Sequence, residues 1–307
     1  MAQPNPITET TIQIPALDGY SLGATHFVPS GSGPFSRVVL VSSGYGIPAA
    51  LYTRFARFLA VAGIPVLTYD YRGIGASRPP NLRGFEAVAE DWSEFDCGGA
   101  IAFLRSRYPD AELVGIAHSF GALLVAGAPN IAEISRFVFV CAHTGYFRDY
   151  LPKYQFPMAV FWHFVMPAIT RLVGYFPGRF LRLGADLPAG VALQWAARRH
   201  PNLRPEATAT DVSRARSMIG RYQDLTGTAL AIGFSDDAFA TEAGTRRLLS
   251  RFPALRAQSL RIAPRDVGLA RIGHFGFFRQ TAEQALWPIV LRFLRDGSGS
   301  MARATTA

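Results

Sequence analysis

The segment that most constrains the fold is a short stretch around Ser119, which reads Glu-Leu-Val-Gly-Ile-Ala-His-Ser-Phe-Gly-Ala-Leu-Leu from residue 112 to residue 124. An apolar, strand-like run comes before the serine, and small residues that suit the start of a helix follow it. Ala117 and Gly121 lie two positions on either side of the serine. Large side chains there would collide with the strand or the helix, so small ones permit a sharp turn. The pattern predicts a strand–turn–helix unit with Ser119 at its apex. An ordinary strand-to-helix turn with a surface serine would have a similar sequence and is the alternative.

Apolar, β-branched runs alternate with helix-like segments along most of the chain. Strands are predicted at residues 10–15, 23–28, 37–42, 64–69, 136–142, 230–234 and 258–262, besides the one that leads to Ser119. Helices are predicted at residues 50–62, 90–107, 241–251 and 281–295. Such alternation predicts an α/β fold with a mostly parallel central sheet and helices on both faces.

The alternation stops between residues 145 and 217, where aromatic residues and prolines are frequent and no clean strand is visible. A loop of this length without secondary structure is implausible inside a compact domain, so we predict an inserted helical unit. Residues 1–144 and 218–296 would then form the core. Residues 297–307 have the composition of a linker and are predicted to be a flexible tail.

A serine hydroxyl is a weak nucleophile and needs a base. Six histidines are candidates: His26, His118, His143, His163, His200 and His274. His26 belongs to an early strand, His118 should point away from its neighbour at a sharp turn, and His200 lies in a charged run. His274 lies between Gly273 and Gly276, in a loop after the last predicted strand. These glycines let the loop bend back to the edge of the sheet, so we predict His274 as the base.

The base in turn needs an acid that orients it. Asp236 and Asp237 follow the predicted strand at residues 230–234. Loops at the carboxyl ends of parallel strands are where α/β sheets place their chemistry. One aspartate could orient His274 while the other caps the next helix. We predict Asp236 as the acid and keep Asp237 as the alternative.

The order Ser119, Asp236, His274 is the nucleophile–acid–base order of the α/β-hydrolase family, which the chain resembles over about residues 10–296. The resemblance is nearest to the serine-aminopeptidase and monoacylglycerol-lipase-like branch, which includes predicted bacterial hydrolases. It implies an α/β-hydrolase fold with residues 145–217 as the cap. It also implies a nucleophile elbow at Ser119, with Ala117 where the usual pattern has glycine.

The same resemblance implies an oxyanion hole, the pair of N–H groups that stabilises the negative oxygen of a reacting carbonyl. Family members place the first donor after the third strand, often in a His-Gly motif; Ser43 and Gly44 stand there in this chain. The N–H of Tyr45 is the predicted donor, with Gly46 as the alternative. Phe120 is the predicted second donor.

The activity that the resemblance implies is that of a serine hydrolase. The expected substrate is a small or medium, largely apolar carboxylic ester, with a thioester or an amide as alternatives. The reaction would pass through an acyl-enzyme on Ser119. Aromatic cap residues that could line the substrate pocket are Phe161, Trp162, Phe164 and Trp195. Acyl transfer, a lyase reaction on the same scaffold and a non-catalytic ligand-binding protein remain alternatives.

Composition argues against other classes. The formal net charge is +9, but 30 of the 31 basic residues are scattered arginines that do not alternate with aromatics, so no nucleic-acid partner is expected. No Gly-x-Gly-x-x-Gly follows the first parallel strand, which argues against a dinucleotide site. Cys97 and Cys141 lack metal-ligand spacing and suit a reducing compartment. We therefore expect no metal, no cofactor and a cytoplasmic location.

Targeting and membrane signals are weak. Residues 1–11 are polar and lack the apolar core of a signal peptide. The most apolar run, residues 156–169, contains two prolines and falls short of the roughly 20 residues that a spanning helix needs. No stable membrane insertion is expected.

Overall fold

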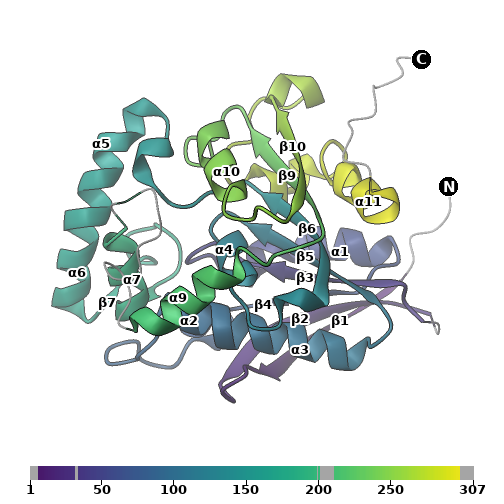
Figure 1. Ribbon diagram of the computed structural model, residues 1–307, viewed down its shortest axis with the longest axis horizontal. Coiled ribbons are helices and arrows are strands. Elements are labelled where there is room, and N and C mark those ends of the chain that lie inside the picture. Colours follow the sequence, from purple (N-terminus) through teal and green to yellow (C-terminus); the bar gives the residue numbers. More distant parts are fainter. Residues whose placement is uncertain (1–5, 32–33, 199, 201–210, 298–307) are drawn as a thin grey trace.

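In the computed structural model, one eight-stranded sheet forms the centre, and a smaller helical unit extends from one end of it (Figure 1). The structure describes residues 6–31, 34–198, 200 and 211–297. The strand order is β1-β2-β4-β3-β5-β6-β9-β10. These strands are β1 (Ile7–Pro15), β2 (Ser21–Pro29), β3 (Arg37–Ser42), β4 (Val66–Tyr69), β5 (Glu112–His118), β6 (Ile134–Val140), β9 (Thr228–Phe234) and β10 (Arg256–Ile262).

All pairings from β4 to β10 are parallel, while β1 and β2 form an antiparallel hairpin that joins the sheet through β4. Successive side chains of a strand point to opposite faces. In β3, Val38 and Leu40 accordingly pack into one apolar cluster, and Val39 and Val41 into another. A sheet buried on both faces explains why its strands read as continuous apolar runs.

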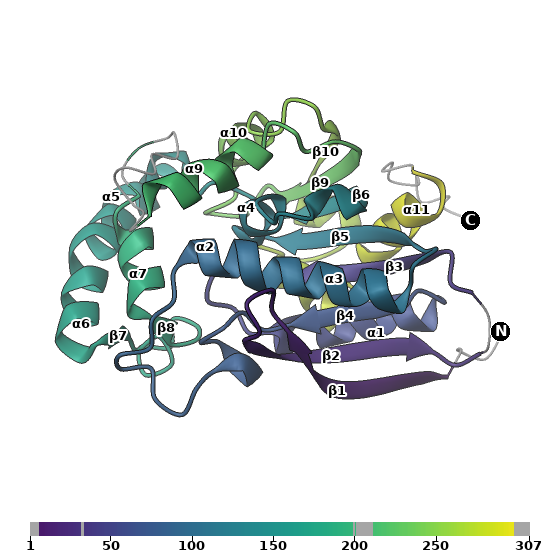
Figure 2. The same cartoon turned by 60° about the horizontal axis from the view of Figure 1, so that its bottom comes forward.

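Helices cover both faces of the sheet. α1 (Thr53–Val61) and α11 (Trp287–Asp296) pack on one face. On the other face lie α2 (Ala89–Asp91), the π-helical turn η3 (Trp92–Cys97) and α3 (Gly98–Arg107), which run on as one helix, together with α4 (Gly121–Ala126), α9 (Val212–Arg221) and α10 (Glu242–Leu249). Figure 2 shows α2 and α3 lying across the sheet. The predicted α/β-hydrolase fold is confirmed.

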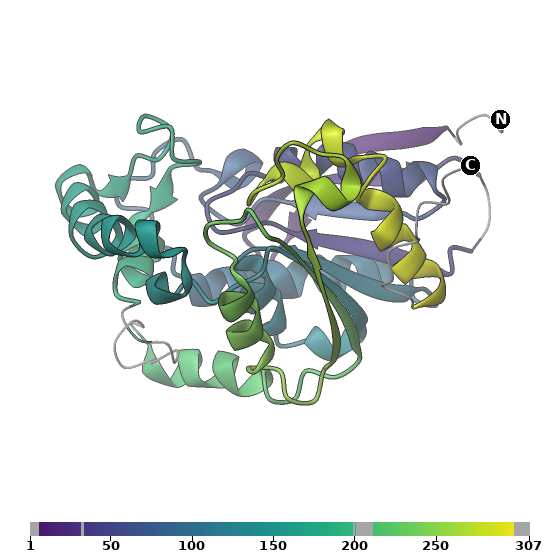
Figure 3. The same ribbon diagram turned by 90° about the horizontal axis from the view of Figure 1, so that it is seen from above.

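The inserted unit, called the cap below, contains α5 (Pro152–Val160), the π-helical turn η6 (Phe161–Val165), α6 (Met166–Val173) and α7 (Ala189–Ala196). A two-stranded sheet of β7 (Tyr175–Phe176) and β8 (Leu187–Pro188) lies between α6 and α7. Sequence patterns missed these strands because they are only two residues long. Figure 3 shows the cap extending away from the central sheet, with α11 toward the other end.

Some boundaries differ from the sequence-based prediction. The strand expected at residues 136–142 ends at Val140, since Cys141 adopts φ +51° and turns the chain out of the sheet. The helix expected at residues 281–295 begins at Trp287, because Pro288 lacks an N–H and is tolerated in the first turn of a helix. The expected boundary between cap and core, at residues 217 and 218, falls inside α9, which packs on the core. The predicted flexible tail lies almost wholly outside the described residues.

Candidate active site

The turn at Ser119 has the geometry that its neighbours predict. β5 ends at His118, Ser119 adopts φ +55°, and α4 begins at Gly121. This left-handed conformation is strained for a residue with a side chain, and such strain is typical of functional turns. A Cβ on Gly121 would overlap the carbonyl of Ser43, which explains the glycine. The methyl group of Ala117 is fully buried in the core, so the sheet accommodates alanine at the other small position.

Ser119 is hydrogen-bonded to His274, and His274 to Asp237. The Ser119 Oγ lies 2.9 Å from the Nε2 of His274, and the Nδ1 of His274 lies 2.8 Å from the Oδ2 of Asp237. Asp237 is fully buried. Although burial opposes ionisation, the charge and hydrogen bond of His274 hold the pKa of Asp237 below its ordinary value, with help from the N–H groups of Phe239 and Ala240. The carboxylate is therefore charged, and it directs the free Nε2 of His274 at the serine.

The choice of Asp236 as the orienting acid is corrected by this geometry. Its carboxylate accepts hydrogen bonds from the N–H groups of Ile272, at 2.9 Å, and Gly273, at 3.0 Å. Asp236 thus fixes the backbone just before His274, while its neighbour contacts the ring. Sequence could not separate the two, because adjacent side chains after a strand end diverge and the turn decides which of them faces inward. In the structure the N–H of Asp237 bonds to the carbonyl of Phe234, and the Asp237 side chain is the buried one.

The backbone N–H groups of two residues next to Ser119 or to the loop beside it are candidates for binding a negatively charged oxygen. Within the described residues, neither the N–H of Tyr45 nor that of Phe120 has a hydrogen-bond partner. A Cβ placed on Gly44 would lie 3.4 Å from the Cβ of Ser119, so the loop after β3 runs against the nucleophile. Phe120 precedes the first turn of α4, where backbone N–H groups favour negative charge. Tyr45 lines the same cavity as Ser119, and Phe120 follows the serine directly, so both residues of the predicted donors lie at the site.

A buried chain of hydrogen bonds ties this loop to the loop of His274. The N–H of Gly44 donates to the Tyr52 hydroxyl at 2.8 Å, and that hydroxyl lies 2.9 Å from the Nδ1 of His118. The Nε2 of His118 donates to the carbonyl of His274 at 3.0 Å. Burial lowers the pKa of His118 to about 3. The ring is therefore neutral, and since its proton is on Nε2, Tyr52 must donate to Nδ1.

His143 is a site residue that the sequence analysis named but did not select. Its Nε2 lies 3.1 Å from the Ser119 Oγ, and its Nδ1 accepts the N–H of Gly145 at 2.9 Å. Burial lowers the pKa of His143 to about 3, so the ring is neutral. Because Nδ1 accepts, the proton is on Nε2, which donates to the serine oxygen. The sequence did contain one signal for His143, which is its position shortly after a buried parallel strand. Ser119 and Asp237 follow parallel strands in the same way.

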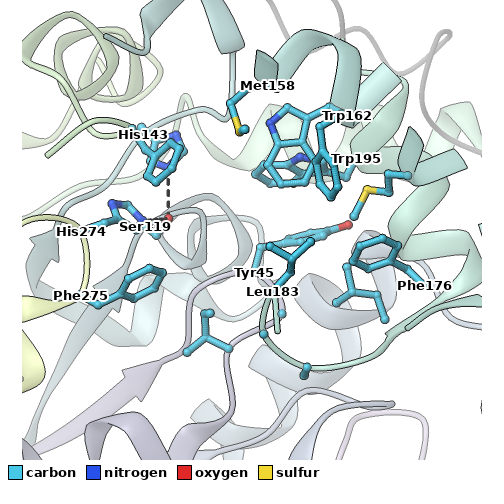
Figure 4. A pocket seen from close by; sticks show the side chains of 18 of the residues that line it. Tyr45, Ser119, His143, Met158, Trp162, Phe176, Leu183, Trp195, His274 and Phe275 are labelled. Carbon is cyan, nitrogen blue, oxygen red and sulfur yellow. Dashed lines mark hydrogen bonds between the residues drawn. The ribbon is translucent and has the colours of Figure 1, made fainter. Parts of the chain in front are cut away.

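These side chains open onto a cavity of about 540 Å³ between core and cap. Figure 4 shows Ser119, His143 and His274 at one end and Tyr45, Trp162, Phe176 and Trp195 toward the other. The wall is mostly apolar. Three of the predicted lining residues, Phe161, Trp162 and Trp195, belong to it. Phe164 does not: its side chain is 65% exposed on the outside of the cap, so its predicted contact with substrate is corrected.

Buried and partly buried polar contacts join the cap to the core. Asp149, at the start of the cap, forms a two-pronged ion pair with Arg247 of α10, at 2.6 and 3.0 Å. Gln194 of α7 donates to Glu90 at 2.6 Å and accepts the N–H of Ala89 at 2.7 Å. These contacts hold the lining aromatics in a defined position over Ser119.

Among the described residues, one group of possible metal ligands lies at the site, formed by His118, Cys141 and His274, with ligand atoms within 4.8 Å of one another. Both ring nitrogens of each histidine already have hydrogen-bond partners. Burial raises the pKa of the Cys141 thiol well above its ordinary value, which opposes the thiolate that binds metals. The hydrogen-bonded arrangement fits proton transfer better than metal binding.

A family model described as "Serine aminopeptidase, S33" matches residues 33–226. The chain belongs to this family of α/β hydrolases. The match includes Ser119, both predicted oxyanion donors and the cap, and it ends before Asp237 and His274. No curated protein sequence matches the chain.

Solved structures with a similar fold include several esterases. The structure of DcsB in complex with its substrate analogue has a TM-score of 0.64 at 14% identity and covers 95% of this chain and 100% of its own. An esterase from Pyrococcus furiosus has a TM-score of 0.59 at 15% identity, covering 94% and 91%. An acetyl xylan esterase from a Paenibacillus species has a TM-score of 0.56 at 18% identity, covering 95% and 86%. At these identities the similarity establishes the fold.

Proposed function

We propose that this hydrolase is a serine esterase that cleaves small or medium, largely apolar carboxylic esters through an acyl-enzyme on Ser119. The observation that carries the proposal is the hydrogen-bonded series Ser119–His274–Asp237 at one end of an apolar cavity. A polar triad beneath an apolar wall suits a substrate with a reactive carbonyl and an apolar body. The esterases among the solved structures of the same fold favour an ester.

In the proposed reaction, the Ser119 Oγ attacks the carbonyl carbon while its proton passes to the Nε2 of His274. Asp237 stabilises the imidazolium that forms and keeps the ring aligned. The N–H groups of Tyr45 and Phe120 bind the oxygen of the tetrahedral intermediate. His274 then gives the proton to the leaving alcohol. A water molecule next attacks the carbonyl of the acyl-enzyme while His274 takes its proton. That proton passes to the Ser119 Oγ as the acid leaves.

His143 has a distinct role in this scheme. With a pKa of about 3 and its proton on Nε2, it is not a base for the serine. Its N–H instead stabilises the negative charge that develops on Oγ as the serine loses its proton. The same hydrogen bond assists when Oγ becomes the leaving group of the acyl-enzyme. A neutral donor that cannot take up the serine proton leaves His274 as the sole base at Ser119.

Replacing His143 by phenylalanine should therefore lower kcat/KM by roughly 10- to 100-fold, the cost of a hydrogen bond to a group that becomes charged. Phenylalanine keeps the ring volume but lacks the donor. His143→Gln should lose less, because its amide can still donate to Oγ. Pre-steady-state bursts with p-nitrophenyl acetate would report acylation and deacylation separately. Equal losses in both variants, matched by equal losses of thermal stability, would reduce His143 to a packing role.

The proposed substrate class is tested by kcat/KM over p-nitrophenyl esters from acetate to decanoate. Trp162→Ala removes a cavity wall and should shift the preference toward longer acyl chains, by about tenfold or more in relative kcat/KM. Phe164→Ala removes an aromatic side chain that is two residues away, is 65% exposed to solvent and does not line the cavity, so it is the matched control and should leave the profile unchanged. No hydrolysis of any ester by the wild type would contradict the proposed function. A uniform loss in Trp162→Ala would place the acyl chain elsewhere.

A further inference from the structure

The outer side of the cap is unusually apolar for a surface. The helical run from Pro152 to Val173 has a mean hydropathy of 1.3 over 18 residues, yet only 22% of that window is buried. Exposed apolar side chains recur along it at a spacing of about four residues. They are Phe156, Val160, Phe164, Val165, Ala168 and Leu172, which we call the outer stripe. Phe156 is 77% exposed and Leu172 is 85% exposed. Water-facing helices normally carry polar residues on this side.

The charges around the outer stripe have a single sign. From residue 150 to residue 185 the chain contains no aspartate or glutamate, but it contains Lys153, Arg171, Arg179 and Arg182. The acidic residues at either end of this segment are buried and paired elsewhere, Asp149 with Arg247 and Asp186 with Arg78. Within the described residues, none of the four cations forms an ion pair with a carboxylate. Their charge is available to an external anion.

The cavity opens within the same segment. Leu183 and Arg182 line the cavity and are also exposed to solvent, so they mark its mouth. Phe180, in the same loop, is 86% exposed. Apolar surface and cationic charge thus extend from the outer stripe toward the entrance that leads to Ser119. A surface with exposed apolar side chains next to cations suits a partner that has an apolar interior and anionic groups on its surface.

We propose that the outer stripe and the loop around Phe180 dock on the surface of a lipid bilayer that contains anionic lipids. Helices with an apolar face and basic borders bind in this way, with apolar side chains among the acyl chains and cations at the headgroups. A second copy of the chain fits less well, because two such faces would bring like charges together. Lys153 and Arg171 near the two ends, and the buried residues Met166 and Thr170 on the inner side, favour a helix that lies on the membrane over one that crosses it.

Docking would place the mouth of the cavity against the membrane. Apolar esters that partition into the bilayer would then reach Ser119 without crossing water. This part of the inference rests on the proposed esterase function, whereas the docking itself does not. Ser119→Ala should therefore bind vesicles as the wild type does, which separates a failure of docking from a failure of the proposed activity.

The test is sedimentation with vesicles of phosphatidylcholine alone and of phosphatidylcholine and phosphatidylglycerol in equal parts. The wild type should bind the anionic vesicles. Phe156→Ser/Leu172→Ser should weaken binding at least about tenfold, since both side chains lose their apolar contact. Lys153→Gln/Arg171→Gln should weaken binding to anionic vesicles by roughly 25-fold, about fivefold for each cation.

A matched control removes the same charge elsewhere. Arg256, at the amino end of β10, and Arg295, in the last turn of α11, lie away from the cap. Arg256→Gln/Arg295→Gln should bind as the wild type does. Thermal unfolding of every variant checks the fold. Absence of wild-type binding, or equal loss in the control, would overturn the proposal. A dimer that Phe156→Ser/Leu172→Ser dissociates, without vesicle binding, would assign the outer stripe to a second copy.

Discussion

Replacing Ser119 by alanine should lower kcat/KM for p-nitrophenyl esters by about 10⁴- to 10⁶-fold and abolish labelling by a fluorophosphonate. The reason is that the Ser119 Oγ is the single atom that both histidines contact. It donates a hydrogen bond to the Nε2 of His274 and accepts one from the Nε2 of His143. Alanine offers no nucleophile in its place. What activity remains would come from the N–H groups and the cavity, which still bind the ester.

The fold should survive this change, because Cβ stays in place and the backbone conformation at φ +55° is no harder for alanine. The thermal unfolding temperature of Ser119→Ala is the control. Ser250→Ala, at the end of α10, removes a surface hydroxyl that bonds to the carbonyl of Arg247 and should keep full labelling. Mass spectrometry that locates the probe on another residue, or full activity in Ser119→Ala, would end the serine-hydrolase proposal.

The fold could be predicted from the sequence because its signals are local and repeated. Continuous apolar runs such as residues 37–42 fit strands buried on both faces, and they recur in alternation with helices. The turn at Ser119 was visible for the same reason, since small residues are required within two positions of it. Cys141 decides where a strand ends and Pro288 decides where a helix begins. At these two boundaries the predicted position differed from the observed one by a few residues.

The site was harder to predict because it is assembled from distant segments. His143 reaches Ser119 only through the turn at Cys141, and its protonation depends on the N–H of Gly145 and on burial. Neither burial nor a backbone partner can be read from the sequence. The outward position of Phe164 was missed for a related reason, because an apolar residue in an apolar helix is expected to face inward. Its exposure is visible only when the helix is packed.

The adjacent aspartates make the sharpest comparison at the site. Asp237→Asn should lower kcat/KM by about 10⁴-fold, by analogy with the serine–histidine–aspartate template. An amide in place of the carboxylate cannot stabilise the imidazolium, and its NH₂ would turn His274 toward the wrong tautomer. Initial rates with p-nitrophenyl esters give kcat/KM for the variant, and thermal unfolding checks that it is folded.

Asp236→Asn is the matched control, identical in chemistry and one residue away. It weakens two hydrogen bonds from backbone N–H groups but leaves the contact between Asp237 and His274 in place. We expect a loss of about tenfold or less, together with a lower unfolding temperature, because the loop of His274 is less firmly held. The reverse ranking, with Asp236→Asn the more damaging in kcat and unchanged in stability, would mean that Asp236 orients the base during the reaction. Equal, small losses in both variants would remove the orienting acid from the proposed mechanism altogether.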